Sequence, residues 1–543
     1  MIRIDGIKLP VLTARDPAAD IEITGTPETE LLRRKCAKAL RIAPESIKSL
    51  SIAKKSIDAR DKSNIQFVYS VDVELPKPSD EARCLRLKHV ARVKPFVYSP
   101  PVMRSKPRVR PVVAGCGPAG LFAALTLCLA GAPPLLIERG CELGRRSELV
   151  RRFWARGELD TDTNVQFGEG GAGAFSDGKL TTGINDPRTA FVLETLIRAG
   201  APADIAYAAK PHIGTDILPD VVRNLRQRLI GMGAEISFES RLAGIRAENG
   251  RLVYIQIVSN GVTERVPAES LILAVGHSAR DTFEALLGAG VAMRPKPFAV
   301  GVRIEHAQSF IDGRQYGAFA RHAALGPAEY KLAARLSGGR GAFTFCMCPG
   351  GTVVAAASER DGVVTNGMSS RARDAQNANS ALLIGVEPAD WGGGTLGGAE
   401  FQRDLERAAF ALGGGAHKAP VQLVGDFLAG RPSDALGSVW PTYSRGFALT
   451  DLRGCLPGFV ADGLKEALPL FDRKLPGFAA RDAVLTAVET RSSSPMTITR
   501  EADFQSNIAG LYPCGEGAGH AGGIMSAAAD GMRCAEALAR NIR

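Results

Sequence analysis

The chain of 543 residues is poor in several features that mark specialised protein classes. Its ten cysteines are too scattered for the disulfide framework of a small secreted domain. The N-terminal segment MIRIDGIKLPVLTARD lacks the apolar stretch that follows basic residues in a secretory leader. Aromatic residues make up only 6% and no internal repeat stands out, which fits an ordinary globular enzyme. We therefore predict a cytoplasmic protein.

Several catalytic and metal-binding patterns are also missing. The sequence shows no Ser-His-Asp order, no P-loop and no zinc-ligand spacing. One uncharged run, Pro111 to Ile137, is long enough to cross a bilayer. Pro133 and Pro134 interrupt that run, and its glycines indicate a strand, a turn, a helix and a second strand. We predict no membrane span and no metal site.

Basic charge is concentrated in one connector. The net charge is +10, and nine Lys or Arg residues lie between Arg83 and Arg110 without a single Asp or Glu. This Pro-rich, basic composition predicts an exposed linker or a strap over an acidic domain surface. Contact with nucleic acid is the alternative, but no aromatic or helical reading module accompanies the charge. The connector therefore does not by itself predict a nucleic-acid partner.

The order of strand-like and helix-like segments predicts an α/β chain. The N-terminal part reads as a small α+β domain, with a helix near 28–40 and strands near 47–53 and 66–75. Strands and helices then alternate as in a Rossmann-like domain with a parallel sheet and a β-meander, interrupted by an inserted mixed α+β substrate domain. The predicted boundaries are 1–100 for the N-terminal domain, 101–295 for the first part of the dinucleotide-binding domain, 296–490 for the substrate domain and 491–543 for the C-terminal part.

The strongest local signal is VVAGCGPAG followed by PLLIE. Gly115, Gly117 and Gly120 fit G-x-G-x-x-G between an apolar strand and a helix, where glycines allow a tight turn, approach of a pyrophosphate and close helix packing. Glu138 lies 18 residues after Gly120, where its carboxylate can accept from ribose hydroxyls and disfavours a 2′-phosphate. The motif predicts dinucleotide binding.

Three later segments favour FAD over NAD. LILAVGHS is an apolar strand that ends in Ala-x-Gly, as in a second fingerprint of FAD proteins. The glycine-dense NVQFGEGGAGAFSDGKL suggests a loop whose backbone follows a flat ring. In YPCGEGAGHAGGIMSAAADG, a helix beginning near 522–526 could stabilise the negative charge on the pyrimidine end of reduced flavin.

Longer motifs carry a family resemblance. FGEGGAGAFSDGKL, KPFAVGVRIEH, FCMCPGG, VVTNGMSSRARDAQNANSALL, DAVLTAVETRSSSP and YPCGEGAGHAGGI together resemble a bacterial and plastid FAD-dependent dehydrogenase family, related to glutathione-reductase-type FAD/NAD(P)-binding oxidoreductases. The resemblance runs over nearly the whole chain and implies FAD and an inserted substrate domain. The predicted cofactor-binding residues are Gly115, Gly117, Pro118, Ala119, Gly120, Glu138, Arg139, Gly170, Gly171, Ser176, Lys179, Leu242, Ala274, Gly276, Gly515, Glu516, Gly522, Gly523 and Ile524.

Three residues outside these motifs are candidate catalytic residues. His520 follows the last glycine turn and could exchange a proton beside the flavin, although a capping or packing role is the alternative. Arg491 could hold an acidic substrate or the flavin pyrimidine edge, or be structural. Arg303 and Glu305 share one strand face opposite His306 and could form a structural ion pair instead.

The cysteines of FCMCPGG leave two interpretations open. Cys346 and Cys348 have a C-x-C spacing rather than the C-x-x-C of a common redox pair, and on a strand they share one face. They are either small buried residues or a thiol relay to the flavin. Cys514 precedes the flavin turn and has the same two interpretations, whereas Cys116 fills a variable fingerprint position and is expected to be inert.

These patterns predict an FAD-dependent oxidoreductase that transfers hydride between flavin N5 and a small substrate under the second domain. With one dinucleotide fingerprint, NAD(P)H would bind only transiently, or an electron-transfer partner protein would supply electrons. The alternatives are a flavin-dependent RNA-modifying enzyme and a non-catalytic flavin redox sensor or binding protein.

Overall fold

The structure is a computed structural model that describes residues 1–11, 28–103, 105–320 and 322–542. Part of the N-terminal segment and Arg104 of the basic connector lie outside these residues. The described chain forms two compact units, one of residues 1–98, 202–212 and 309–329, the other of residues 99–201, 213–308 and 330–543 with the stated gaps. The division into four segments predicted above stays a prediction.

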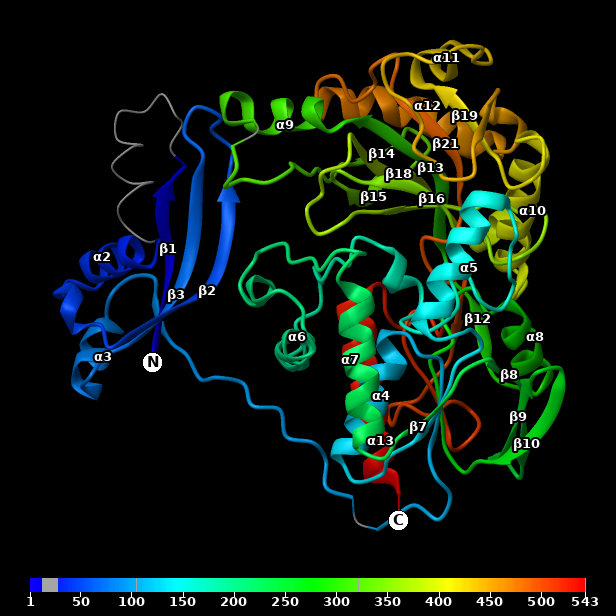
Figure 1. Ribbon diagram of the computed structural model, residues 1–543, viewed down its shortest axis with the longest axis horizontal. Coiled ribbons are helices and arrows are strands. Elements are labelled where there is room, and N and C mark those ends of the chain that lie inside the picture. Colours follow the sequence, from blue (N-terminus) through cyan, green and yellow to red (C-terminus); the bar gives the residue numbers. More distant parts are fainter. Residues whose placement is uncertain (12–27, 104, 321, 543) are drawn as a thin grey trace. The chain divides into compact units, whose positions relative to one another are not determined.

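The first unit contains a four-stranded antiparallel sheet in the order β2-β3-β1-β4 (Figure 1). Strict alternation in QFVYSVDVE buries Phe67, Tyr69, Val71 and Val73 on one face, as a half-buried strand requires. The β-α-β-β-α-β order with β1 and β3 in the centre is the ferredoxin-like arrangement. Its elements are β1 (Ile2–Pro10), α2 (Glu28–Leu40), β2 (Ser49–Asp58), β3 (Gln66–Glu74), α3 (Pro78–Cys84) and β4 (Val90–Arg92), and most of α9 (Gln308–Tyr316) also belongs to this unit.

The second unit is built on a five-stranded parallel sheet, which confirms the predicted α/β class. The chain adds its last strand beside β11, so the sheet is completed by residues from opposite ends of the unit. The strand order is β23 (Leu511–Pro513), β11 (Leu271–Leu273), β5 (Val112–Ala114), β6 (Leu135–Ile137) and β7 (Glu235–Ser237).

Helices and a meander complete this part of the unit. The helix α4 is apolar all round and almost wholly buried, which explains why its sequence resembles a membrane span. Figure 1 shows α4 beside α13 and α7, and no helix of the described residues is long and apolar enough to cross a membrane. The helices are α4 (Pro118–Leu129), α5 (Leu143–Arg156), α6 (Arg188–Arg198), α7 (Leu218–Gly231), α8 (Arg280–Gly288) and α13 (Ile524–Asn541), and the meander strands are β8 (Ser240–Glu248), β9 (Arg251–Ser259) and β10 (Val262–Pro267).

A seven-stranded mixed sheet lies between β11 and β23 in the sequence. Its central strands β13, β18 and β21 are almost entirely buried because other elements pack on the sheet, including α12 and α10. The order is β14 (Ala333–Arg335), β15 (Gly341–Cys348), β18 (Asn377–Val386), β13 (Phe298–Ala307), β21 (Val484–Glu489), β19 (Ala419–Leu423) and β20 (Phe447–Leu449). The remaining elements are β12 (Met293–Pro295), β16 (Thr352–Ala355), β17 (Thr365–Met368), α10 (Gly397–Leu412), α11 (Val424–Ala429), α12 (Gly458–Lys474) and β22 (Met496–Ile498).

Candidate functional site

A cavity of about 370 Å³ lies within the second unit, at the carboxyl ends of the parallel strands. Open α/β sheets bind ligands at this edge, and the volume is within the range of cofactor and substrate cavities. Seventeen of the predicted cofactor-binding residues line it; they are Gly115, Gly117, Pro118, Ala119, Glu138, Arg139, Gly171, Ser176, Lys179, Leu242, Ala274, Gly276, Gly515, Glu516, Gly522, Gly523 and Ile524.

The other two predicted residues, Gly120 and Gly170, do not line the cavity. A Cβ at Gly120 would lie 1.8 Å from the Gly115 carbonyl oxygen, so this glycine allows the helix to pack against the turn. Gly170 has a φ of +85°, and its backbone N–H donates to the Cys116 carbonyl oxygen at 2.8 Å. Both support the site without facing it.

The glycine turn after β5 leaves the space that a pyrophosphate needs. Gly115 has a φ of +103°, and a Cβ there would meet the Ala274 carbonyl oxygen at 2.2 Å. A Cβ at Gly117 would instead meet only Gly171 Cα, at 3.7 Å, beside the N-terminus of α4. Backbone N–H groups at that helix end favour an anion. The turn fits the phosphates of a dinucleotide.

Glu138 holds the turn as well as facing the cavity. Its carboxylate accepts backbone hydrogen bonds from Cys116 at 2.8 Å, Gly168 at 2.9 Å and Gly140 at 3.1 Å. A carboxylate can accept about four hydrogen bonds, so one position remains for a ribose hydroxyl. The sequence predicted the ribose contact but not these hydrogen bonds to the backbone of the turn and its neighbours.

Arg146 orders the glycine-rich loop 164–171. Its guanidinium is fully buried and donates to the carbonyl oxygens of five loop residues, at distances from 2.6 to 3.2 Å. Burial lowers the pKa of Arg146 to about 10, which leaves it charged at neutral pH. A Cβ at Gly168 would lie 2.4 Å from Arg146 Cδ, so the loop needs glycine there.

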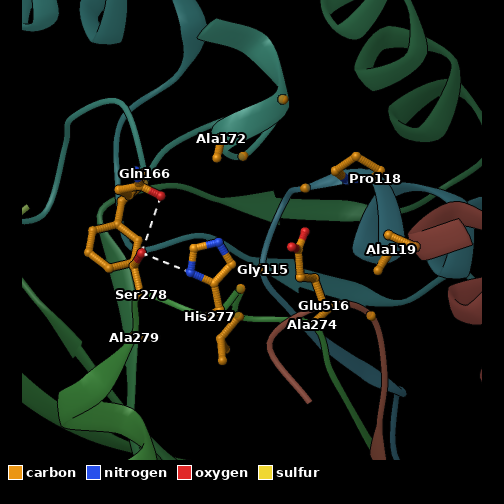
Figure 2. Close-up of a pocket in the computed structure, with 18 of the residues that line it drawn as sticks. Gly115, Pro118, Ala119, Gln166, Ala172, Ala274, His277, Ser278, Ala279 and Glu516 are labelled. Atoms are coloured by element: carbon orange, nitrogen blue, oxygen red, sulfur yellow. Dashed lines mark hydrogen bonds between the residues drawn. The ribbon is translucent and has the colours of Figure 1, made fainter. Parts of the chain in front are cut away.

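Glu516 and His277 direct their side chains into the cavity, as Figure 2 shows. Burial raises the pKa of Glu516 to about 7, although the Gly523 N–H and Lys296 favour its ionised form. Burial lowers the pKa of His277 to about 4, and the nearby Arg491 and Arg280 lower it further. The Ser278 hydroxyl lies 3.4 Å from Nδ1 of this ring and 3.2 Å from Gln166 Oε1. The cavity therefore presents a neutral imidazole and a carboxyl that titrates near neutrality.

Residues of the mixed sheet and its connections form another wall of the cavity. They are Phe345, Cys346, Asn366, Glu489, Arg491 and Ser492. Phe345 is 44% exposed, which is unusual for a large aromatic residue and leaves its ring available to a flat ligand. Burial raises the pKa of Glu489 to about 7 against the opposing charge of Arg303. Sequence reasoning missed Phe345, Asn366 and Glu489, although it singled out two other residues of this wall, Cys346 and Arg491.

The three candidate catalytic residues have different positions. Arg491 lines the cavity, but its guanidinium binds Glu406 at 2.8 and 2.9 Å and Ser358 at 2.5 Å, which leaves little for an acidic substrate. Arg303 is completely buried behind the wall and pairs with Glu489 at 3.0 Å rather than with Glu305. Strand β21 lies beside β13, which brings Glu489 close to Arg303. Glu305 instead accepts hydrogen bonds from Thr442 and Asn377.

His520 does not line the cavity. Its Nε2 lies 2.9 Å from the Ile498 carbonyl oxygen, and its backbone N–H donates to Gly515. Burial lowers the pKa of His520, so the ring is neutral at pH 7. The contacts favour the packing alternative over proton exchange beside the flavin.

Burial bears on the two other cysteines singled out in the sequence. Cys116 and Cys514 are buried, and in both the pKa of the thiol is raised, by burial in Cys116 and by the neighbouring Cys534 together with burial in Cys514. Neither is a reactive thiolate at neutral pH. Among the described residues no group of three or more His, Cys, Asp or Glu side chains could hold a metal ion.

We expect FAD binding to weaken as pH rises through 7, because ionised Glu516 in the cavity lining repels the negatively charged cofactor. The raised pKa means that the carboxyl is neutral below about pH 6 and charged above about pH 8, so affinity should fall by less than tenfold per pH unit between them. The raised pKa also stabilises the FAD-free fold. This stabilisation is complete below about pH 4.5 and is lost as the pH rises through 7. Titration of FAD-free protein by flavin fluorescence tests this, and Glu516→Gln should flatten the profile. An unchanged slope in the variant would assign the titration to another group.

Comparison with known proteins places the chain in a family. The family described as "FAD-dependent protein, C-terminal domain-like" matches residues 297–492, and "Domain of unknown function (DUF8436)" matches residues 1–74. A protein of Clostridium beijerinckii named "Uncharacterized protein" is 48% identical over 523 residues, which covers 95% of this chain and 97% of the relative.

Solved structures are more distantly similar. A variant of the flavin-dependent brominase Bmp2 is 12% identical with a TM-score of 0.36, and 79% of each chain is covered. A geranylgeranyl bacteriochlorophyll reductase-like protein of Thermoplasma acidophilum is 15% identical with a TM-score of 0.35, over 78% of this chain and 76% of that one. These TM-scores are too low to support a functional comparison.

FAD is the cofactor of this protein. The family match on 297–492 names it, and the cavity fits it, because the glycine turn leaves room for phosphates that a Cβ would fill. Glu138 and Arg139 stand at the ribose position of the motif, while Lys179, Cys346 and Glu489 are neighbours elsewhere along the cavity. The chain can thus surround the cofactor and cover it with residues of the mixed sheet.

Proposed function

The chain belongs to the same family as the Clostridium beijerinckii relative and carries the C-terminal domain of FAD-dependent proteins, and from this premise we propose that it is an FAD-dependent oxidoreductase acting on a small-molecule substrate. The observation that carries the proposal is the wall of Phe345, Asn366 and Glu489, in which strands β15, β17 and β21 bring polar and aromatic groups to the dinucleotide cavity. Bound FAD would supply hydride exchange at its N5 atom.

The chain's own residues would orient the substrate and handle protons. Phe345 offers an exposed ring against which a flat group can pack, and Asn366 can donate or accept a hydrogen bond. Glu489 can hold a proton on its carboxyl at neutral pH and release it, since its pKa is about 7. Arg303 fixes that carboxyl through hydrogen bonds of 3.0 and 3.2 Å and acts as a positioning residue.

The relationship to glutathione-reductase-type enzymes and a cytoplasmic location stay predictions. The parallel sheet, the meander and the late return of β23 support the relationship. NAD(P)H or a partner protein would deliver or remove electrons transiently. The RNA-modifying alternative is weaker, because among the described strand residues of the N-terminal sheet Phe67 and Tyr69 are the aromatics and both are buried, whereas RNA-binding sheets stack bases on exposed aromatics.

The test is anaerobic absorbance of the purified full-length protein before and after addition of NADH, NADPH and a panel of small reductants. We expect a yellow protein whose flavin band bleaches with a nicotinamide or with a substrate. A yellow protein that nothing bleaches, combined with partner binding that depends on flavin redox state, would favour the redox-sensor alternative. A colourless protein that takes up no added FAD would overturn the proposal.

A further inference from the structure

The strand β15 is irregular where it reaches the cavity. Phe345 pairs with Ala381 and Cys348 with Asn379, so β15 takes three residue steps where β18 takes two. Cys346 lies in this bulge with a φ of +42°, a left-handed conformation that a non-glycine residue adopts at a cost. Strand bulges re-aim side chains beside active sites. The regular strand expected from the sequence is therefore wrong at this motif.

The bulge brings two thiols together at the cavity wall. Cys346 lines the cavity and is partly exposed, whereas Cys348 is fully buried behind it. The Cys348 thiol donates to the Cys346 carbonyl oxygen at 3.4 Å, and the two side chains interact electrostatically. In an extended strand, residues two apart have Cα atoms separated by about 6.6 Å, close to the upper limit of about 6.8 Å for a disulfide. A left-handed bend shortens that span.

The charges around the pair favour a thiolate on Cys346. The interaction with the Cys348 thiol and the positive charges of Lys179 and Arg303 lower the pKa of Cys346 well below its ordinary value. Asp177 opposes them, but it is bound by Arg373 and by Lys179, the latter at 2.9 Å.

Two more carboxyls interact with Cys346, and both are partly protonated at neutral pH. They are Glu489 and Glu516, whose pKa values are each raised to about 7 by burial. The interaction with Cys346 and burial raise the pKa of Cys348 well above its ordinary value, although Lys179 and Arg303 oppose that shift. The pair thus has one ionised and one protonated sulfur, the division that an attacking and a resolving thiol need.

Cys346 differs from the other cysteines in its exposure to solvent. Of the ten cysteines, all within the described residues, Cys346 is partly exposed and the other nine are buried. Arg303 holds the pair in place, since it donates to the Cys346 carbonyl at 2.7 Å and lies 3.9 Å from the Cys348 sulfur. A Cβ at Gly367 would come within 2.3 Å of the Arg303 guanidinium, so the chain leaves room for this buried cation beside the thiols.

We propose that Cys346 and Cys348 are a dithiol–disulfide pair at the cofactor cavity, and that the substrate class is a low-molecular-weight disulfide. This rests on the proposed oxidoreductase function and deepens it by naming the bond that is reduced. The recessed position of Cys346 in a cavity favours a small disulfide over one in a folded protein.

The exchange balances as follows. The Cys346 thiolate attacks one sulfur of the substrate disulfide, the substrate S–S bond breaks, and the first substrate thiolate leaves and takes a proton from solvent. Cys348 then loses its proton and attacks the Cys346 sulfur, and the second substrate thiol leaves with that proton. The products are one protein disulfide and two substrate thiols. Two electrons from the reduced cofactor would break the protein disulfide, and one proton from solvent would return Cys348 to the thiol and Cys346 to the thiolate.

Alkylation of the native, full-length protein with iodoacetamide, followed by peptide mass spectrometry, tests the pair without any turnover. After reduction and desalting, Cys346 should be labelled first, at a rate that is flat between about pH 6 and pH 8 because the thiolate is already formed. An ordinary thiol would react about tenfold faster per pH unit over that range. Labelling that spares Cys346, or that rises tenfold per unit, would overturn the proposal.

Oxidation with oxidised glutathione separates the two roles. Wild-type protein should lose labelling at Cys346 and Cys348 and gain an intramolecular disulfide without bound glutathione. Cys348→Ser should stop at a mixed disulfide on Cys346, and Cys346→Ser should form neither product. Cys128→Ser, at a buried cysteine of α4, is the matched control and should behave as wild type. A mixed disulfide that persists in wild type, or faster reaction with hydrogen peroxide than with the disulfide, would contradict the assignment.

A final measurement connects the pair to the cofactor. Photochemical reduction of the oxidised holoprotein should restore iodoacetamide labelling of Cys346, whereas protein stripped of FAD should stay unlabelled. Failure here with a normal alkylation profile would overturn the disulfide substrate and leave the oxidoreductase proposal standing. Failure of nicotinamides to bleach the flavin, with both thiol tests positive, would affect only the electron donor.

Discussion

Replacement of Gly117 by alanine is expected to weaken FAD binding while leaving the fold intact. The new Cβ would meet only Gly171 Cα at 3.7 Å, an ordinary contact, but it would project where the pyrophosphate approaches the backbone. Inserting a methyl group into a close-packed contact costs about 1–3 kcal/mol, which corresponds to an affinity loss of about 5- to 150-fold. Fluorescence titration of FAD-free protein measures it.

The matched control is Gly288→Ala, at the end of α8. No heavy atom lies within 4 Å of a Cβ there, and the residue does not line the cavity. We expect unchanged FAD affinity and a thermal midpoint equal to or above wild type, because alanine is the better helix former. FAD binding of Gly117→Ala equal to that of the control would show that the pyrophosphate does not lie on this turn.

Replacement of Arg146 by methionine is expected to give the largest loss of stability. The change removes the donor for five carbonyl oxygens in the loop 164–171, and a flexible apolar side chain cannot satisfy them. Each buried acceptor left without a donor costs about 1–3 kcal/mol, so the loss should be about 3 kcal/mol or more. Because the loop lines the cavity, the purified variant should also retain less FAD. Urea unfolding and the flavin absorbance of the purified variant measure the two effects.

Arg151→Met on the same helix is the control for that variant. Arg151 is exposed, and its Nε donates only to the Ser147 carbonyl oxygen one turn earlier, at 3.1 Å. We expect the free energy of unfolding to change by less than about 0.5 kcal/mol. Equal stability of the two variants would mean that solvent satisfies the loop carbonyls when Arg146 is absent.

The cofactor motifs were predictable because their physics is local. Gly115, Gly117 and Glu138 act within one strand-turn-helix-strand segment, so their spacing alone indicates a phosphate turn and a ribose acid. The parallel sheet followed from the alternation of strands and helices for the same reason. His520 shows the limit of this reasoning, because proximity to a glycine turn did not reveal that the Ile498 carbonyl binds its ring.

The residues that face the cavity from β15, β17 and β21 depend on long-range pairing. Glu489 reaches Arg303 because β21 lies beside β13, and nothing in GVRIEH distinguishes that partner from Glu305. Asn366 and Phe345 come from separate strands whose register no local pattern specifies. The first strand of the N-terminal sheet and its ferredoxin-like order were also not predicted, since pairing of β1 between β3 and β4 is a non-local choice.

The sequence by itself determined the kind of cofactor site this protein has, because glycines and an acid at set spacings leave the backbone few other conformations. Only the tertiary structure determined which residues from the rest of the chain lie beside that site. The bulge in β15 lies where Cys346 lines the cavity and Cys348 is buried. The interaction between the two thiols lowers the pKa of Cys346 and raises that of Cys348, and the charges of Lys179 and Arg303 favour the thiolate. Electrostatic environment and strand register are properties of the packed molecule, so a C-x-C spacing could not reveal them.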